Sequence, residues 1–214
     1  MTQKSNILAI AAKEVGYKQA ANGSNKYGVW YGADKQPWCA IFLSWCAAQA
    51  GIGNDVIPKF AYVPHGMGFY KGQGRFRAAK GYTPQPGDIV FYDFNSNGTS
   101  DHVGIVTGYS NHMISTIEGN TSSVSQTNGG AVERKRRSAV SGVAGYGLPK
   151  YAEEEEDVEI ITVKVKSLDT GDYIEVEAVN VGGSNYIKLR DIQKLVPVKI
   201  DWDGKNPTMN LAYK

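Results

Sequence analysis

The sequence contains a thiol, an imidazole and a carboxylate whose settings could together form a nucleophilic site. Cys39 stands near the start of the apolar segment 37–51, which has no polar face and is predicted to be a buried helix between Pro37 and Gly51. Unpaired N–H groups and the positive end of the helix dipole lie at such a start, and both favour a thiolate. Cys39 is therefore the candidate nucleophile.

A thiol nucleophile needs a nearby base, and the base needs a group that holds its ring. His102 opens one predicted strand, Glu118 ends the next, and Asn120 follows two residues later. If these strands pair in a tight hairpin about residue 110, His102 lies opposite residue 118. We therefore expect Glu118 to accept a hydrogen bond from Nδ1 of His102, or Asn120 to orient the ring through its amide oxygen.

The remaining cysteine and histidines have plainer interpretations. Cys46 lies seven residues beyond Cys39, or about 10 Å along a helix axis, which is too far for a disulfide. Both thiols are predicted to be free, with Cys46 packed in the core. His112 is expected in an exposed turn. The candidates for lining a substrate groove are His65 and three aromatic residues, which could equally cover the core: Tyr27, Trp30 and Trp38.

Hydrophobic periodicity predicts helices in the first half of this region and strands in the second. Ser5 is a plausible N-cap for a helix that Gly16 ends, residues 17–36 are loop-like, and a short helix is expected near 62–70. From residue 83 the period changes to two. The expected strands are 89–92, 102–109, 113–118, 131–137 and 144–148, which form an antiparallel meander in an α+β domain.

Four motifs resemble those of the CHAP family of peptidoglycan hydrolases, in the family's order. They are Trp38-Cys39-Ala40-x-Phe42-x-Ser44-Trp45, Pro86-Gly87-Asp88-Ile89-Val90-Phe91, Asp101-His102-Val103-Gly104-Ile105-Val106 and Ile117-Glu118-Gly119-Asn120. The resemblance covers roughly residues 5–150. It implies a papain-like fold, with N-terminal helices packed on an antiparallel sheet.

The resemblance also implies a reaction. Cys39 would be the nucleophile, His102 the base, and Glu118 with Asn120 the orienting pair. The thiolate would attack an amide of the wall peptide and form an acyl-enzyme that water hydrolyses. The backbone N–H of Cys39 and one side chain would hold the oxyanion, and Gln36 is the weak candidate for that side chain. No cofactor is required by this chemistry.

A turn before His102 has some features of a calcium loop. Asp93, Asn95, Asn97 and Asp101 follow the spacing of the first ligands of such a loop, but the twelfth position is Gly104 and the bidentate glutamate is missing. A structural calcium ion is one interpretation, and a turn built from residues that favour turns is the stronger one.

Charge divides the chain into two parts joined by an acidic linker, residues 153–158. Residues 1–152 hold 15 Lys and Arg against 8 Asp and Glu, a net charge of +7, and residues 153–214 hold 8 against 13, a net charge of −5. A basic domain favours an anionic partner such as nucleic acid or a wall polymer. Its densest basic patch, residues 134–137, equally reads as a solvated strand edge guarded by charge.

The last part, residues 159–214, is predicted to be a small β-rich domain with one short helix near 190–195. Residues 185–192 and 200–203 are similar to the small repeat named after the copper amine oxidase N-terminal domain. That resemblance implies wall attachment or self-association and no copper chemistry.

The function predicted from the sequence is cleavage of a peptidoglycan amide bond, as an N-acetylmuramoyl-L-alanine amidase or an endopeptidase. The expected partner is bacterial peptidoglycan, as substrate and wall ligand, and neither nucleic acid nor a membrane. No apolar run approaches the roughly 20 residues of a membrane span, and the N-terminus shows no signal region. We therefore expect a phage or prophage lysin made in the host cytoplasm and released onto the wall. The alternative is a wall-binding module with a degenerate site.

Overall fold

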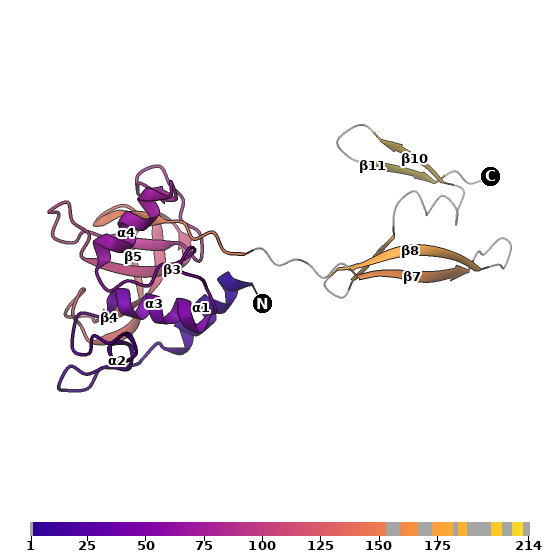
Figure 1. Cartoon of the computed structure of the whole chain (residues 1–214). Coiled ribbons are helices and arrows are strands. Elements are labelled where there is room, and N and C mark those ends of the chain that lie inside the picture. The colour runs from indigo at the N-terminus through magenta and orange to yellow at the C-terminus, as the bar shows by residue number, and fades with distance from the viewer. Residues whose placement is uncertain are drawn as a thin grey trace. The chain divides into compact units, whose positions relative to one another are not determined.

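The computed structural model describes residues 2–152 and, beyond them, 159–166, 173–181, 184–187, 198–202 and 207–211. The chain divides into two compact units, Met1–Glu153 and Glu154–Lys214 (Figure 1). The predicted linker, 153–158, lies outside the described residues. None of the helices in the described part of the chain is long and apolar enough to cross a membrane.

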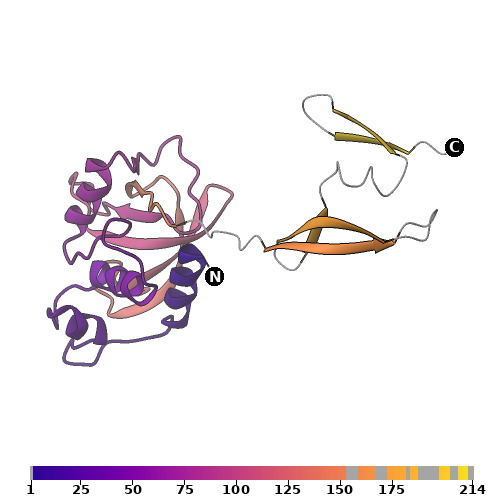
Figure 2. The ribbon, with the colours of Figure 1, turned by 45° about the vertical axis from the view of Figure 1, so that its right-hand side comes forward.

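The first unit combines helices with an antiparallel sheet, which confirms the predicted α+β class. Helices α1 and α3 pack on each other, and α3 packs on strands β3 and β4 (Figures 1 and 2). The helices are α1 (Gln3–Lys13), α2 (Lys26–Tyr31), α3 (Cys39–Gln49) and α4 (Val63–Gly72). The strands are β1 (Phe76–Arg77), β2 (Ile89–Tyr92), β3 (His102–Ser110), β4 (Met113–Thr121), β5 (Ala131–Ser138) and β6 (Val143–Gly147).

The sheet follows the predicted meander only in part. Its strand order is β1-β6-β2-β3-β4-β5, so β2 to β5 are neighbours in sequence and in space. The prediction was wrong for β6, which returns across the sheet and pairs with β2 and β1. The return is anchored by Tyr146, which is fully buried and donates a hydrogen bond from its hydroxyl to the carbonyl of Ala139 at 2.7 Å.

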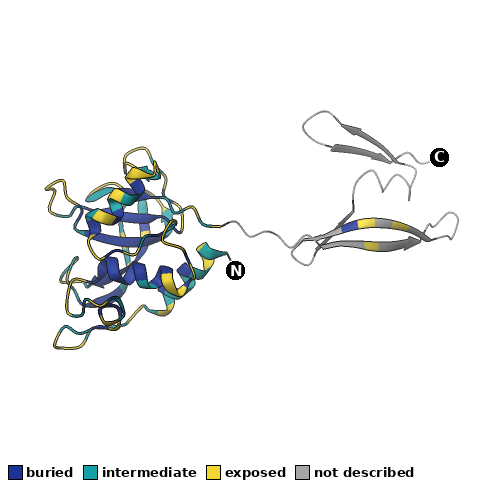
Figure 3. Cartoon of the chain, viewed as in Figure 1, coloured by how far each residue is buried: buried dark blue, intermediate teal, exposed yellow. Residues whose placement is uncertain are grey.

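Helix α3 is the buried element that carries the candidate nucleophile. Its side chains are buried from Cys39 through Ser44, and Cys46 and Ala47 are buried as well (Figure 3). The helix begins at Cys39 because Trp38 is not helical (φ −125°, ψ 17°). It ends before Gly51, which adopts the expected left-handed conformation at φ 68°. The thiol therefore lies in the first turn, where helical N–H groups lack intrahelical acceptors.

Two details of the N-terminal region differ from the sequence-based predictions. The N-cap of α1 is Thr2, whose side chain accepts a hydrogen bond from the backbone N–H of Ser5, so Ser5 itself is not the cap. The supposed loop at 17–36 contains α2, which is capped by Asn25 and ended by Gly32 at φ 87°. Helix α2 was missed because it is only two turns long and shows little periodicity.

The described part of the second unit is made of strands. Strands β7 (Glu159–Lys166), β8 (Tyr173–Val181) and β9 (Ser184–Ile187) form an antiparallel sheet. Strands β10 (Val198–Trp202) and β11 (Pro207–Leu211) pair antiparallel. The helix predicted near 190–195 lies outside the described residues.

The packing of α3 on β4 depends on a residue without a side chain. A Cβ atom on Gly119 would lie 2.5 Å from Cβ of Phe42, so the helix can approach the strand only because this position is glycine. We expect Gly119→Ala to lower the free energy of unfolding by about 1–3 kcal/mol, as overpacking does. Gly108→Ala is the matched control, because the new Cβ would meet only Ser115 at 4.0 Å. Chemical denaturation of both variants measures the difference, and equal stabilities would contradict the packing described.

Candidate active site

Candidate catalytic residues from three of the four sequence motifs meet at the start of α3. Cys39 is the first residue of this helix and is 4% exposed. His102 is the first residue of β3, and Glu118 lies near the end of β4. A cleft of about 360 Å³ opens beside Cys39, and its lining includes Gln36, Tyr62 and Thr127. The thiol is therefore at the boundary between the buried core and a space that a substrate could enter.

The predicted contact between His102 and Glu118 is present in the structure. Nε2 of His102 lies 3.1 Å from Oε2 of Glu118, and both side chains are fully buried. The prediction was wrong about the ring nitrogen, because it assigned this bond to Nδ1. Nδ1 is buried and has no hydrogen-bond partner. Burial lowers the pKa of the imidazole, and Cys39 is one of the two groups whose interactions outweigh burial and raise it. The ring therefore offers Nε2 to the carboxylate and leaves Nδ1 for the thiol.

The two residues meet diagonally across the hairpin and not directly opposite each other. Ile105 pairs with Ile117, so in this register Glu118 lies beside Gly104. A Cβ atom on Gly104 would lie only 2.6 Å from Cγ of Glu118, which shows that the glutamate crosses this glycine to reach His102. The predicted register was wrong by two residues because the hairpin turns at Asn111 and His112 and not about residue 110. The turn displaces the pairing by three residues, and the shift between Val106 and Gly108 recovers one of them.

Glu118 has more partners than the sequence indicated. Arg137 donates two hydrogen bonds to it, from Nε to Oε1 at 2.8 Å and from Nη2 to Oε2 at 2.7 Å. Oε1 also accepts bonds from the hydroxyls of Tyr92, at 3.0 Å, and Thr116, at 2.6 Å. Sequence reasoning missed these three residues. A signal was available for two of them, because Tyr92 pairs with His102 across β2 and β3, and Thr116 shares a strand face with Glu118.

The pair is arranged as an imidazolium and a carboxylate. Burial is the largest influence on His102 and lowers its pKa, but hydrogen bonds and charge interactions with Cys39 and Glu118 outweigh burial and raise the pKa to about 9. Burial raises the pKa of Glu118, but Arg137 and His102 outweigh it and lower the pKa to about 2. At neutral pH the carboxylate is ionised and the imidazole favours its protonated form, as a thiolate–imidazolium pair requires.

The hydrogen bonds of the Asn120 side chain go to residues other than His102. Its side-chain nitrogen donates to the carbonyl of Thr127 at 3.1 Å and to Oδ1 of Asn128 at 3.3 Å, and its side-chain oxygen accepts from the N–H of Gly130 at 3.3 Å. Because Thr127 lines the cleft, Asn120 shapes one wall of the site. The expected bond from its amide oxygen to the imidazole is replaced by these contacts.

Two of the predicted groove residues are core residues instead. Tyr27 is fully buried and Trp38 is 1% exposed, and the two rings stack with centroids 5.0 Å apart. The Tyr27 hydroxyl donates to Glu14, and the indole N–H of Trp38 donates to Gln19 at 2.8 Å. These rings cover the core beside α3, the alternative that the sequence left open.

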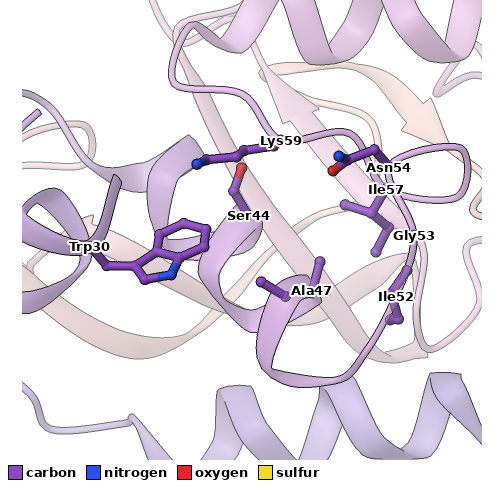
Figure 4. A pocket seen from close by; sticks show the side chains of 9 residues that line it. Trp30, Ser44, Ala47, Ile52, Gly53, Asn54, Ile57 and Lys59 are labelled. Carbon is purple, nitrogen blue, oxygen red and sulfur yellow. The ribbon is translucent and has the colours of Figure 1, made fainter. Parts of the chain in front are cut away.

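The other two predicted groove residues lie outside the cleft lining. Trp30 lines a separate pocket of about 260 Å³ with Ser44, Ile57 and Lys59 (Figure 4). His65 is exposed on α4 and packs edge-on against the ring of Tyr62, which does line the cleft. The sequence did not identify Tyr62 as a cleft residue, because the residues around Pro64 show no regular hydrophobic pattern.

The proposed oxyanion and calcium residues have different outcomes. Gln36 is exposed and lines the cleft with Cys39, so it can reach the site. In the turn from Asp93 to Asp101, side-chain oxygens accept backbone N–H bonds, as the interpretation of a turn without calcium expects, and the calcium ion stays a prediction. Asp93 accepts from Asn97 and Gly98, and Asp101 accepts from residues 94 and 95. Among the described residues, no group of three or more acidic, Cys or His residues could hold a metal.

The second thiol is separate from the site. Cys46 is 1% exposed, neither cysteine is in a disulfide, and burial raises the pKa of the Cys46 thiol well above its ordinary value. It therefore stays protonated and unreactive.

Comparisons with known proteins identify a domain within the first unit. Residues 30–120 match the family model of the CHAP domain. Among solved structures, Ly7917, described with the hydrolyzing product of MDP, is 16% identical, with coverage of 83% of each chain and a TM-score of 0.43. A wild type endolysin, LysIME-EF1, is 14% identical, with coverage of 91% of this chain and 84% of that chain and a TM-score of 0.41. The comparison with curated proteins gave no match.

The buried pair makes stability depend on pH in a defined direction. Glu118 stabilises the fold fully above its unfolded pKa, and this contribution is lost as the pH falls toward about 2. His102 stabilises the fold fully below its unfolded pKa of 6.5, and this contribution is lost as the pH rises through about 9. Thermal unfolding should therefore show a decline in Tm between pH 6.5 and 9 that is absent in His102→Gln. His112→Gln, in an exposed turn, is the control, and a decline that persists in His102→Gln contradicts the assignment.

Proposed function

We propose that this protein hydrolyses an amide bond in the peptide of bacterial peptidoglycan, with Cys39 as nucleophile and His102 as base. The observation that carries the proposal is the buried Cys39–His102–Glu118 arrangement at the side of a cleft. The CHAP match supports it, because residues 30–120 include all three of these positions. The substrate class comes from that match, and the chemistry comes from the side chains.

The first half of the reaction forms an acyl-enzyme. His102 accepts the Cys39 proton at Nδ1, and the thiolate attacks the amide carbonyl carbon to form a C–S bond. The carbonyl oxygen becomes negative, and the N–H of Cys39 at the start of α3 stabilises it, with Gln36 as the second donor. The C–N bond then breaks as the imidazolium gives its proton to the leaving nitrogen.

The second half returns the enzyme to its starting state. His102 removes a proton from water, the hydroxide oxygen attacks the thioester carbon, and the C–S bond breaks to release a carboxylic acid and the thiolate. Glu118 stays ionised throughout and holds the imidazole through Nε2. Two bonds suit this chemistry: the amide between the lactyl group of the glycan and the stem peptide, and a peptide bond within the stem or cross-link.

We also propose roles for the second unit and for the place of action. The β-rich unit would attach the enzyme to the wall or join two copies of the chain, as its resemblance to a small wall-associated repeat suggests. The whole chain would act on the wall as a lysin after release from the cytoplasm of the host. The net charge of +7 on residues 1–152 favours approach to an anionic wall.

The proposal predicts that Cys39→Ser lowers lysis of purified bacterial walls by more than about 1,000-fold. The same variant should still sediment with walls, because binding does not need the thiol. Cys46→Ala is the matched control and should remain active. Mass spectrometry of the wild-type digest distinguishes a freed lactyl-linked sugar from a cut peptide. Undiminished lysis by Cys39→Ser would exclude the mechanism, and wall binding without lysis by the wild type would indicate a degenerate binding module.

A further inference from the structure

The basic run on β5 holds two half-buried cations and two exposed ones. The side chains of Lys135 and Arg137 are 13% and 14% exposed, whereas Arg134 and Arg136 are exposed, and Lys135 pairs with Glu133 at 2.7 Å. Arg137 places both Nε and Nη2 on the two oxygens of Glu118, at 2.8 and 2.7 Å. Such a two-point contact fixes the plane of the carboxylate as well as its position.

The aromatic rings of Tyr92 and Phe94 hold the guanidinium of Arg137 in place. The central carbon of the Arg137 guanidinium lies 5.2 Å from the ring centroid of Tyr92 and 5.0 Å from that of Phe94. These two rings stack on each other at 4.8 Å, and both lie 5.9 Å from the imidazole of His102. The same two rings therefore position both Arg137 and His102, and Glu118 is hydrogen-bonded to both of these residues.

The charges around Glu118 explain why a second cation is needed. Glu118 is fully buried, and a buried carboxylate is stable only while it is paired and hydrogen-bonded. In the proposed reaction His102 becomes neutral each time it gives its proton to the leaving nitrogen, so it cannot pair with Glu118 throughout the cycle. Arg137 carries a permanent charge, and it is the partner that remains.

We propose that Arg137 is a positioning residue that keeps Glu118 ionised and aimed at Nε2 of His102 while the imidazole loses and regains its proton. Its importance for lysis depends on the proposed function, but its effect on the imidazole does not. The titratable and charged groups near this pair come from several elements: Cys39 from α3, Tyr92 from β2, Asp101 just before β3 and Arg137 from β5.

The direct test is an NMR titration of the His102 imidazole in the full chain, which has only three histidines. Arg137→Met removes the cation that keeps the carboxylate ionised and aimed at Nε2, so the imidazolium loses support from Glu118. We therefore expect the pH at which His102 loses its proton to fall by about one unit, and a rise would show that the carboxylate keeps its place and charge without Arg137, which contradicts the proposal. Arg136→Met removes the same charge from an exposed neighbour and should leave this pH within about 0.3 units. A purely structural role for Arg137 would not move this titration.

Wall lysis provides the second measurement. Arg137→Met should lower kcat for lysis by about 10-fold or more, Arg137→Lys should recover part of the loss because it keeps the charge, and Arg136→Met should match the wild type. If Arg137→Met fails to fold, Arg137→Gln removes the charge but keeps an N–H donor, and the same directions are expected. An unchanged His102 titration in the charge-removing variant overturns the proposal, even if lysis falls. A wild type that lyses no walls contradicts the proposed function, and the titration then decides the role of Arg137 independently.

Discussion

A buried carboxylate must be kept ionised in this fold, and much of the sheet serves that requirement. Glu118 is hydrogen-bonded to four side chains, each on a different strand: Tyr92 on β2, His102 on β3, Thr116 on β4 and Arg137 on β5. Removing one partner from such a group leaves an uncompensated charge and is strongly destabilising. The order β2-β3-β4-β5 is therefore required for chemistry as well as for packing, because it brings these residues to one place.

Helix α3 brings the candidate nucleophile, Cys39, to the imidazole that Glu118 positions. Helix α3 is buried on nearly all sides, and Gly119 lets Phe42 of the helix pack closely on β4. The same strand thus carries Glu118 toward the imidazole and accepts the helix that carries Cys39. Two adjacent residues of β4 thereby connect core packing to the geometry of the site.

Much of the site could be predicted from the sequence, and the limits have physical reasons. Cys39 stands near the start of a uniformly apolar segment, and His102 and Glu118 stand at the ends of predicted strands, so local signals were sufficient to select them. The register was wrong because the hairpin turns at Asn111 and His112 and not about residue 110. The ring nitrogen was wrong because the side of the ring that Cys39 approaches depends on tertiary packing. Arg137 was missed because a run of four basic residues is typical of a solvated strand edge. Only the folded structure shows that Arg137 reaches Glu118 while Lys135, on the same face, pairs with Glu133. The sequence alone does not show whether an aromatic residue such as Tyr27 or Trp38 covers the core or lines a groove.

The coupling of Cys39 to His102 is open to a direct measurement that requires no substrate. The rate at which iodoacetamide alkylates Cys39 at neutral pH can be followed by peptide mass spectrometry, which separates it from the buried Cys46. We predict that the wild type reacts rapidly and that His102→Ala slows this reaction, because a nearby base activates a thiol. Equal rates in both proteins would show that the imidazole does not activate the thiol, and would contradict the mechanism.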